Sequence, residues 1–217
     1  MRSTKDYHDV QTVAELITRV FCDTRPRRKV DAVYIFGESR DNEDSVLETG
    51  ISLWKSGRVK RVCIPSQSSF WVTRHKEWKK RLMSGGVPES RILGIPLSHD
   101  FPPSTDAEAS GLADNAKLHN WKNIFITATP LHHLRAFIST ISALDRKKIK
   151  LNIFNYAGSA QSWNKNIVHS QDIQRGTRRK LIYKELEKIE HYFQKGDLIS
   201  PRKTLKYLDN RGESKGQ

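Results

Sequence analysis

Apolar residues recur along the chain with two alternating periods. A spacing of three or four residues is typical of amphipathic helices and predicts helices over 9–22, 43–56, 73–83, 105–119, 130–144 and 171–193. Short apolar runs bounded by glycine, proline or polar residues predict buried strands over 30–36, 61–65, 91–95, 123–128 and 150–154. The remaining segment 155–170 is predicted to be a loop.

This alternation of strands and helices indicates the fold class. A helix between two strands makes a crossover connection, which joins parallel strands. We therefore expect an α/β fold, a three-layer Rossmann-like domain with a mainly parallel sheet of about five strands, helices on both faces, and extra N-terminal and C-terminal helices. We expect one domain over residues 1–195 and a basic, flexible tail over 196–217, because the tail is mostly polar.

Length and composition restrict the class of protein further. A chain of 217 residues can bury a sizeable core without disulfides or metals. Its two cysteines, Cys22 and Cys63, lie in apolar segments and are predicted to be reduced core thiols. The sequence has no run of about 18 apolar residues and no apolar signal core at its start, so we expect a cytoplasmic protein without a membrane span.

The net charge of +14 is unevenly distributed. Residues 55–81 carry nine basic side chains and one acidic one, whereas residues 31–50 carry six acidic side chains and one basic one. A basic face attracts nucleic acid, acidic protein or anionic metabolites, and an ordinary solvated surface is the alternative. Trp71 and Trp78 lie in the basic segment, where they would stack on bases, although Trp78 also fits the packing face of a helix.

Polar loops follow four of the predicted strands. In open parallel sheets, ligands bind beyond the carboxyl ends of the strands, and the helix N-termini there attract anions. A phosphate or carboxylate ligand is therefore expected at this edge. The candidate ligand-binding residues are Gly37, Glu38, Ser39, Arg40, Ser66, Gln67, Thr105, Thr129 and Arg135.

His132 and Arg135 are three residues apart, so they share a helix face. An imidazole beside a guanidinium suits a phosphoryl or carboxylate group, with His132 as acid or base, and a surface pair is the alternative. The neighbouring His133 points about 100° away from His132.

The acidic residues of these loops leave two interpretations open. They could hold a divalent cation beside the anion, or they could simply cap the helices that follow. Their spacing matches no standard cation loop, so no residue is assigned as a metal ligand. The acidic residues concerned are Glu38, Asp41, Glu43, Asp44, Asp106 and Glu108.

Standard catalytic motifs are missing from the sequence. It contains no P-loop lysine motif, no G-x-G-x-x-G after a strand, no G-x-S-x-G and no H-E-x-x-H. Their absence argues against the familiar nucleoside triphosphate, dinucleotide and serine-hydrolase sites.

Several stretches, in this order and spacing, resemble the YdcF-like (SanA-like) family over roughly residues 30–140. They are the strand and glycine at 33–37, the helix, glycine and strand at 53–64, the Gly-Val-Pro turn at 83–92, the helix start at 105–109 and the segment 126–136. The resemblance implies a Rossmann-like fold and a nucleotide or S-adenosylmethionine ligand. It also implies pocket roles for Gly37, Ser66, Thr105, Glu108, Thr129, His132 and Arg135, with His132 and Glu108 as the catalytic candidates.

The chain also departs from the family pattern. Glu48 occupies the helix where the family usually has an arginine, Ala128-Thr129 replaces Thr-Ser, and Ser66-Gln67-Ser68 replaces Ser-Gly-Gly. The ligand is therefore expected to differ from that of other members.

Three functional hypotheses follow. The first is an enzyme, a transferase or hydrolase, acting on an anionic, phosphate-bearing or nucleotide-like small molecule. The second is a non-catalytic module that binds a nucleotide or S-adenosylmethionine. The third is a nucleic-acid binder that uses the basic face.

Overall fold

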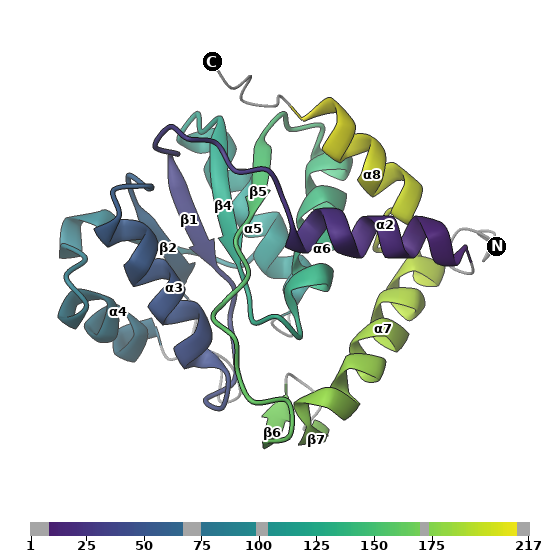
Figure 1. Cartoon of the computed structure of the whole chain (residues 1–217). Helices are drawn as coiled ribbons and strands as arrows, with labels where there is room; N and C mark the ends of the chain where they lie inside the picture. Colours follow the sequence, from purple (N-terminus) through teal and green to yellow (C-terminus); the bar gives the residue numbers. More distant parts are fainter. Residues whose placement is uncertain (1–8, 67–74, 99–103, 170–173, 212–217) are drawn as a thin grey trace.

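Five short parallel strands form the central sheet of the computed structural model, which describes residues 9–66, 75–98, 104–169 and 174–211 (Figure 1). The strands run in the order β3-β2-β1-β4-β5, and Val33 at the centre lies opposite both Val62 and Phe125. This arrangement confirms the predicted α/β fold. The strands are β1 (Ala32–Ile35), β2 (Val62–Pro65), β3 (Ile92–Ile95), β4 (Asn123–Thr127) and β5 (Asn152–Asn155).

Helices cover both faces of the sheet (Figure 1). On one face lie α3 (Glu43–Lys55) and α4 (His75–Ser84), and on the other lie α5 (Thr105–Leu118) and α6 (His133–Lys147). Outside α6 are α2 (Val10–Phe21), α7 (Arg178–Lys195) and α8 (Pro201–Asn210). A short 3-10 helix, η1 (Glu89–Arg91), precedes β3.

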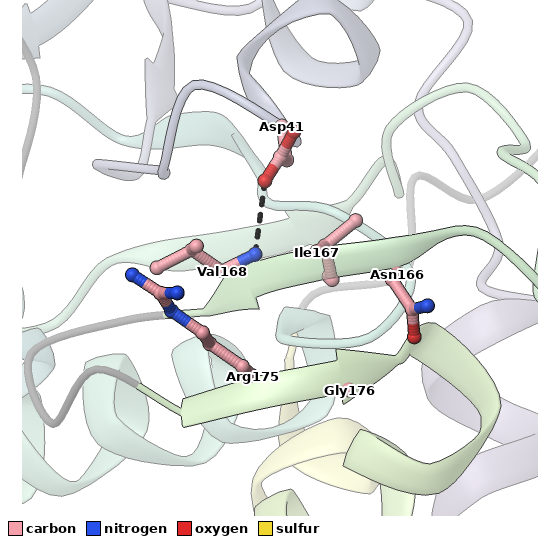
Figure 2. Close-up of a pocket in the computed structure, with 6 residues that line it drawn as sticks. All are labelled: Asp41, Asn166, Ile167, Val168, Arg175 and Gly176. Atoms are coloured by element: carbon pink, nitrogen blue, oxygen red, sulfur yellow. Dashed lines mark hydrogen bonds between the residues drawn. The ribbon is translucent and has the colours of Figure 1, made fainter.

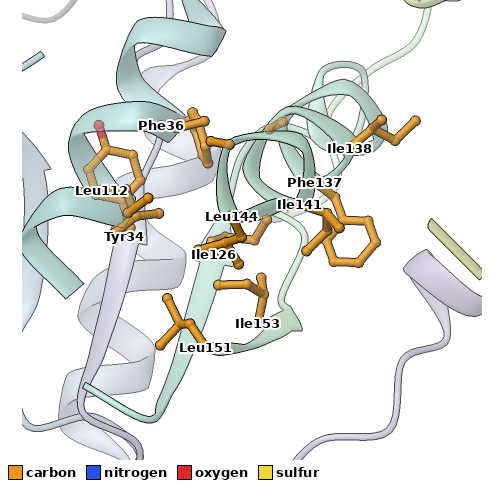
Figure 3. Close-up of a cluster of buried hydrophobic side chains, with 14 of the residues drawn as sticks. Tyr34, Phe36, Leu112, Ile126, Phe137, Ile138, Ile141, Leu144, Leu151 and Ile153 are labelled. Carbon is orange, nitrogen blue, oxygen red and sulfur yellow. The ribbon is translucent and has the colours of Figure 1, made fainter. Parts of the chain in front are cut away.

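The larger core lies between the sheet and the two helices α5 and α6. Figure 3 shows Phe36, the residue after β1, and Ile126 of β4 on the side of the sheet that faces Phe137 and Ile141 of α6. Every second residue of a strand points to the same face, which is why Tyr34 and Phe36 join this core while Val33 and Ile35 pack against α3 and α4.

The chain order changes direction at the centre of the sheet. From β1 the chain steps outward to β2 and β3, and then returns to the other side of β1 as β4. The carboxyl ends of β1 and β4 therefore mark the topological switch point, where a ligand site is expected in this class of sheet. The starts of α3, α5 and α6 follow strands at this same edge.

Three predicted segments differ from the structure. α6 begins at His133 instead of Pro130, because the carbonyl of Thr129 closes a turn by accepting from the N–H groups of His132 and His133. The predicted loop 155–170 contains β6 (Asn166–His169), which pairs antiparallel with β7 (Gln174–Thr177). The predicted helix over 171–193 accordingly starts only at Arg178.

The segment beyond residue 196 also differs from expectation. α8 begins with Ser200 as its cap and Pro201 in its first turn, and buries Leu205 and Leu208 in the core. It lies beside α2, where Arg19 and Asp209 form an ion pair. The expected flexible tail thus contains a packed helix.

The two cysteines lie in different environments. Cys63 is buried in β2, and burial raises the pKa of its thiol above the usual value of 9.0. Cys22 ends α2 and is exposed, so the prediction of two core thiols is wrong for this residue. Among the residues that the structure describes, no helix has the length and apolar character that crossing a membrane requires.

Candidate functional site

A buried polar network occupies the switch point between β1 and β4. Glu38 follows β1 and is 4% exposed. Its Oε1 accepts hydrogen bonds from the N–H of Thr129, from the Thr129 hydroxyl and from Nδ1 of His132, at 3.0, 3.0 and 3.1 Å. Burial alone would raise the pKa of Glu38, but the hydrogen bonds that its carboxylate accepts from His132 and from the N–H of Thr129 outweigh it, and the pKa lies below its usual 4.5.

His132 links Glu38 to Thr105. Its Nε2 lies 3.1 Å from Oγ1 of Thr105, the first residue of α5. Burial and the nearby Arg135 lower the pKa of His132, so the ring is neutral near pH 7. A carboxylate only accepts, and the ring therefore carries its proton on Nδ1 and leaves Nε2 as an acceptor. The hydrogen-bonded groups therefore follow the order carboxylate, imidazole and hydroxyl.

Thr105 receives a second contact from Arg135. Nη1 of Arg135 donates to Thr105 Oγ1, which leaves the hydroxyl proton of Thr105 free to point at His132 Nε2. His132 and Arg135 thus meet at one hydroxyl, as their shared helix face predicted.

Arg135 is itself neutralised by Glu185 of α7. Its Nε and Nη2 donate to the two oxygens of Glu185 at 2.6 and 3.2 Å, and both side chains are buried. Burial would raise the pKa of Glu185, but the charge of Arg135 and the hydrogen bond from His169 keep it well below 4.5. Because a carboxylate already holds this guanidinium, the structure gives no support to Arg135 as the anion-binding group.

Glu108 lies one turn after Thr105 on the same face of α5. Its Oε2 accepts from the N–H of Gly37 at 2.9 Å and from the hydroxyl of Tyr34 at 3.1 Å. Burial raises the pKa of Glu108 to about 7, and the nearby Glu38 adds to the effect. Near pH 7 the carboxylate of Glu38 is therefore ionised, whereas Glu108 exchanges its proton readily because its pKa lies close to that pH; acid–base chemistry requires such a division of roles.

His133 faces away from this network, as its position next to His132 predicted. Its Nδ1 accepts from the N–H of Ala128, and its Nε2 bonds to Oδ1 of Asn155 at 3.1 Å. Burial lowers the pKa of His133 to about 4. This neutral histidine ties α6 to β5 and has no contact with Thr105 or Glu38.

The remaining predicted residues lie apart from the network. Ser66 sits at the end of β2, where its N–H donates to the carbonyl of Ile95. Arg40 is exposed, and Ser39 lies in the loop between β1 and α3. Gln67 and Trp71 lie outside the described residues. Trp78 is buried with its Nε1 donating to Glu43, so it offers no surface for a base.

The acidic residues of the loops do not gather at one place but bind partners in different parts of the structure. Glu43 and Asp44 bind Arg81, Asp106 binds Arg146, and Asp41 accepts from the N–H of Val168. Within the described ranges, no three acidic, histidine or cysteine side chains form a group that could hold a metal ion.

The sequence analysis missed three polar residues of this edge: Glu185, His169 and Arg178. Each comes from one of the segments 155–170 and 171–193, for which the sequence pattern predicts a loop and a long helix. The sequence does contain a signal for Glu185. This charged residue lies between Ile182 and Ile189 at helical spacing, on the face of the helix that is predicted to be buried. The β6–β7 hairpin brings His169 within hydrogen-bond distance of Glu185, at 2.8 Å.

An open pocket of about 560 Å³ lies at the same hairpin (Figure 2). Figure 2 shows Asp41 reaching from the loop after β1 toward the N–H of Val168, 2.9 Å away. Arg175 and Ile167 contribute to the lining from the two strands. The pocket therefore has one acidic wall and one basic wall.

Comparisons of the chain with protein-family models, curated proteins and solved structures found no match.

Proposed function

We propose that this protein is an enzyme, a transferase or hydrolase, that acts on an anionic, phosphate-bearing or nucleotide-like small molecule at the carboxyl ends of β1 and β4. One observation carries the proposal: Glu38, His132 and Thr105 form a hydrogen-bonded chain of carboxylate, imidazole and hydroxyl. The same order of groups activates the nucleophile in hydrolases of unrelated folds.

The chemistry of the end groups fixes the direction of this chain. Glu38 can only accept and Arg135 can only donate, so the proton of Thr105 points to His132 and that of His132 points to Glu38. In the proposed reaction, Oγ1 of Thr105 forms a bond to the electrophilic phosphorus or carbon, and its proton moves to His132 Nε2. The bond to the leaving group breaks, and the leaving group takes that proton. Water or an acceptor then releases the group from Thr105.

The surrounding groups suit these steps. The donor from Arg135 stabilises negative charge that develops on Thr105 Oγ1. The protonated carboxyl of Glu108, one turn away, can donate to a substrate oxygen through Oε1, since both of its hydrogen bonds fall on Oε2. The starts of three helices at this edge favour an anionic substrate.

The resemblance to the YdcF-like family supports the same location, because four of its expected pocket residues, Thr105, Thr129, His132 and Arg135, belong to the network. Two more lie beside it, since Glu108 interacts electrostatically with Glu38 and accepts from Gly37, whereas Ser66 lies apart. The resemblance also suggests nucleotides and S-adenosylmethionine as ligands to try.

The test is a turnover screen with aryl phosphates, aryl esters, nucleotides and S-adenosylmethionine, comparing wild type with Thr105→Val. Thr140→Val is a matched control, because Thr140 is also a buried helical threonine but its hydroxyl bonds only to the carbonyl of Ala136. We expect Thr105→Val to abolish turnover and Thr140→Val to retain it. Equal turnover in both variants would rule out Thr105 as the nucleophile.

A non-catalytic binding module is separated by the same screen. Ligand binding by wild type without any product after long incubation would favour that alternative. Mass spectrometry of wild type with a reactive substrate is expected to find the transferred group on Thr105, and a modification elsewhere would contradict the proposed step.

A further inference from the structure

Three arginines are buried in the described part of the chain, and they differ in their partners. Arg135 is paired with Glu185, and Arg211 is paired with Asp23. Arg178, which is 3% exposed, forms no ion pair with any residue that the structure describes. It donates instead to neutral oxygens, namely Oδ1 of Asn42 and the carbonyls of Ser162 and Asp41. A buried charge without a counter-ion is unfavourable, and proteins normally pair it.

The acidic residues nearest to Arg178 are occupied by other contacts. Glu38 and Asp41 act on its charge, but Glu38 is bound by Thr129 and His132. The side chain of Asp41 accepts from the N–H of Val168 and lies 3.8 Å from Lys165. The guanidinium is therefore not neutralised by direct contact.

A second observation lies beside it. Asn42 is fully buried at the start of α3, where it makes no capping hydrogen bond. Its Oδ1 accepts from Nε of Arg178 at 3.1 Å, whereas its Nδ2 has no partner. The buried hydroxyl of Ser39, three residues earlier, has no partner either. These polar groups come from the loop after β1, next to Glu38 of the proposed site.

The unused donors can be counted. A guanidinium has five N–H groups, of which Arg178 uses three, so two remain. The amide Nδ2 of Asn42 adds two and the Ser39 hydroxyl adds one. A forked cation with several neutral donors matches a tetrahedral oxyanion, which offers more acceptor sites than a carboxylate.

From these contacts we infer that Arg178, Asn42 and Ser39 hold a phosphate-class oxyanion, the anionic part of the substrate. That this anion belongs to a substrate rests on the proposed function, whereas the anion site itself does not. It transfers the anion-binding role expected of Arg135 to Arg178. Asp41 connects this site with the open pocket, since its carbonyl accepts from Arg178 while its side chain lines the pocket (Figure 2). The pocket then offers space for the remainder of the ligand.

The decisive variant is Asn42→Asp. It keeps the oxygen that accepts from Arg178, supplies the missing counter-charge and removes the Nδ2 donors. We expect this variant to melt at a higher temperature than wild type and yet to bind inorganic phosphate about ten-fold more weakly or worse. Loss of binding through misfolding would lower the melting temperature instead, so the two explanations are distinguishable.

The experiment is a melting-temperature titration of the full chain with inorganic phosphate, against sodium chloride of equal ionic strength. Wild type is expected to gain melting temperature with phosphate beyond the chloride curve, as a ligand of the native state must cause. Arg179→Gln removes a neighbouring exposed charge and is expected to show the same phosphate-specific gain as wild type. Arg178→Gln is expected to lose most of this gain, as Asn42→Asp does.

Three results would overturn the inference. They are no phosphate-specific gain in wild type, an undiminished gain in Asn42→Asp, or an equal reduction in Arg179→Gln, which would indicate unspecific charge attraction. His132→Gln is expected to bind phosphate normally and to lack turnover. A failure of the proposed chemistry and a failure of the anion site therefore give different patterns.

Discussion

Nε of Arg135 lies 2.6 Å from Oε2 of Glu185, and this buried ion pair joins α6 to α7. Glu185 neutralises the guanidinium of Arg135, which the sequence analysis predicts to bind an anion. The same contact holds the guanidinium so that Nη1 reaches the hydroxyl of Thr105. Arg135 therefore acts on Thr105, and the neutral surroundings of Arg178 become the better place for an anion.

Removing one member of this pair should be much worse than removing both. Glu185→Leu leaves a buried, uncompensated guanidinium and should lower the free energy of unfolding by about 3–5 kcal/mol. The double variant Arg135→Met/Glu185→Leu should recover most of this loss, because the buried guanidinium is removed together with its counter-ion. Urea denaturation of both proteins is the measurement, and a double variant less stable than Glu185→Leu would contradict the ion-pair interpretation.

Glu38 should matter to turnover far more than to binding. Glu38→Gln keeps an oxygen for Thr129 but no longer stabilises an imidazolium, and it can leave His132 in the wrong tautomer. By analogy with serine hydrolases, we expect kcat to fall by a factor of about 10³–10⁴. The measurement is the pre-steady-state rate with an aryl substrate. A change in KM with kcat unaltered would contradict the proposed proton transfer from Thr105 to His132.

Glu108 should make the folded state less stable as the pH rises. The pKa of its carboxyl is about 7 in the native protein and about 4.5 when the chain unfolds, so the native state binds the extra proton between these values. Stability should fall as the pH rises from 4.5 through 7, by about 3 kcal/mol in total.

Glu108→Gln can still accept from Gly37 and Tyr34 but does not titrate. Its free energy of unfolding, measured by urea titration between pH 5 and pH 8.5, should therefore fall less with pH than that of wild type. Parallel curves for the two proteins would show that Glu108 ionises normally.

His133 should give the opposite dependence. Its pKa is about 4 in the native protein and about 6.5 in the unfolded chain, so the unfolded chain binds the extra proton. Stability is complete above pH 6.5 and is lost as the pH falls toward 4, by about 3 kcal/mol. His133→Gln should be less stable than wild type at pH 8 and should lose less on acidification. An unchanged slope between pH 7 and pH 4.5 would argue against a buried neutral imidazole.

Arg211 should anchor the C-terminal end of α8 to β5. Its guanidinium binds buried Asp23 and the carbonyl of Ile153, and Asp23 in turn accepts from the N–H of Asn155. Arg211→Ala leaves Asp23 unpaired and should cost about 3–5 kcal/mol. The exposed pair of Arg19 and Asp209 is the control, and Asp209→Asn should cost less than about 1 kcal/mol in the same denaturation experiment. Similar losses in both variants would contradict the anchoring role.

Local patterns were sufficient for the α/β core. Strands, helices and the site edge followed from the spacing of apolar residues and from the geometry of parallel crossovers, which places Glu38, Thr129 and His132 together because each follows β1 or β4. The helix α8 was not expected, because its apolar residues are few and its burial depends on contact with α2 and β5. The hairpin could not be predicted either, since β6 and β7 are each four residues long and Ile167 packs against Leu131 and Leu181, which are distant in the chain.

The sequence by itself determined which residues could lie at the switch point. The spacing of apolar residues along the chain depends on near neighbours, and the crossover connections place the ends of the parallel strands at one edge of the sheet. Only the tertiary structure decided which of the charged residues has a partner. Arg135 and Glu185 are 50 positions apart, and Arg178 and Asn42 are 136 positions apart. Burial makes such pairings energetically decisive, because a charge removed from water must be neutralised or hydrogen bonded by whatever the fold brings within about 3 Å.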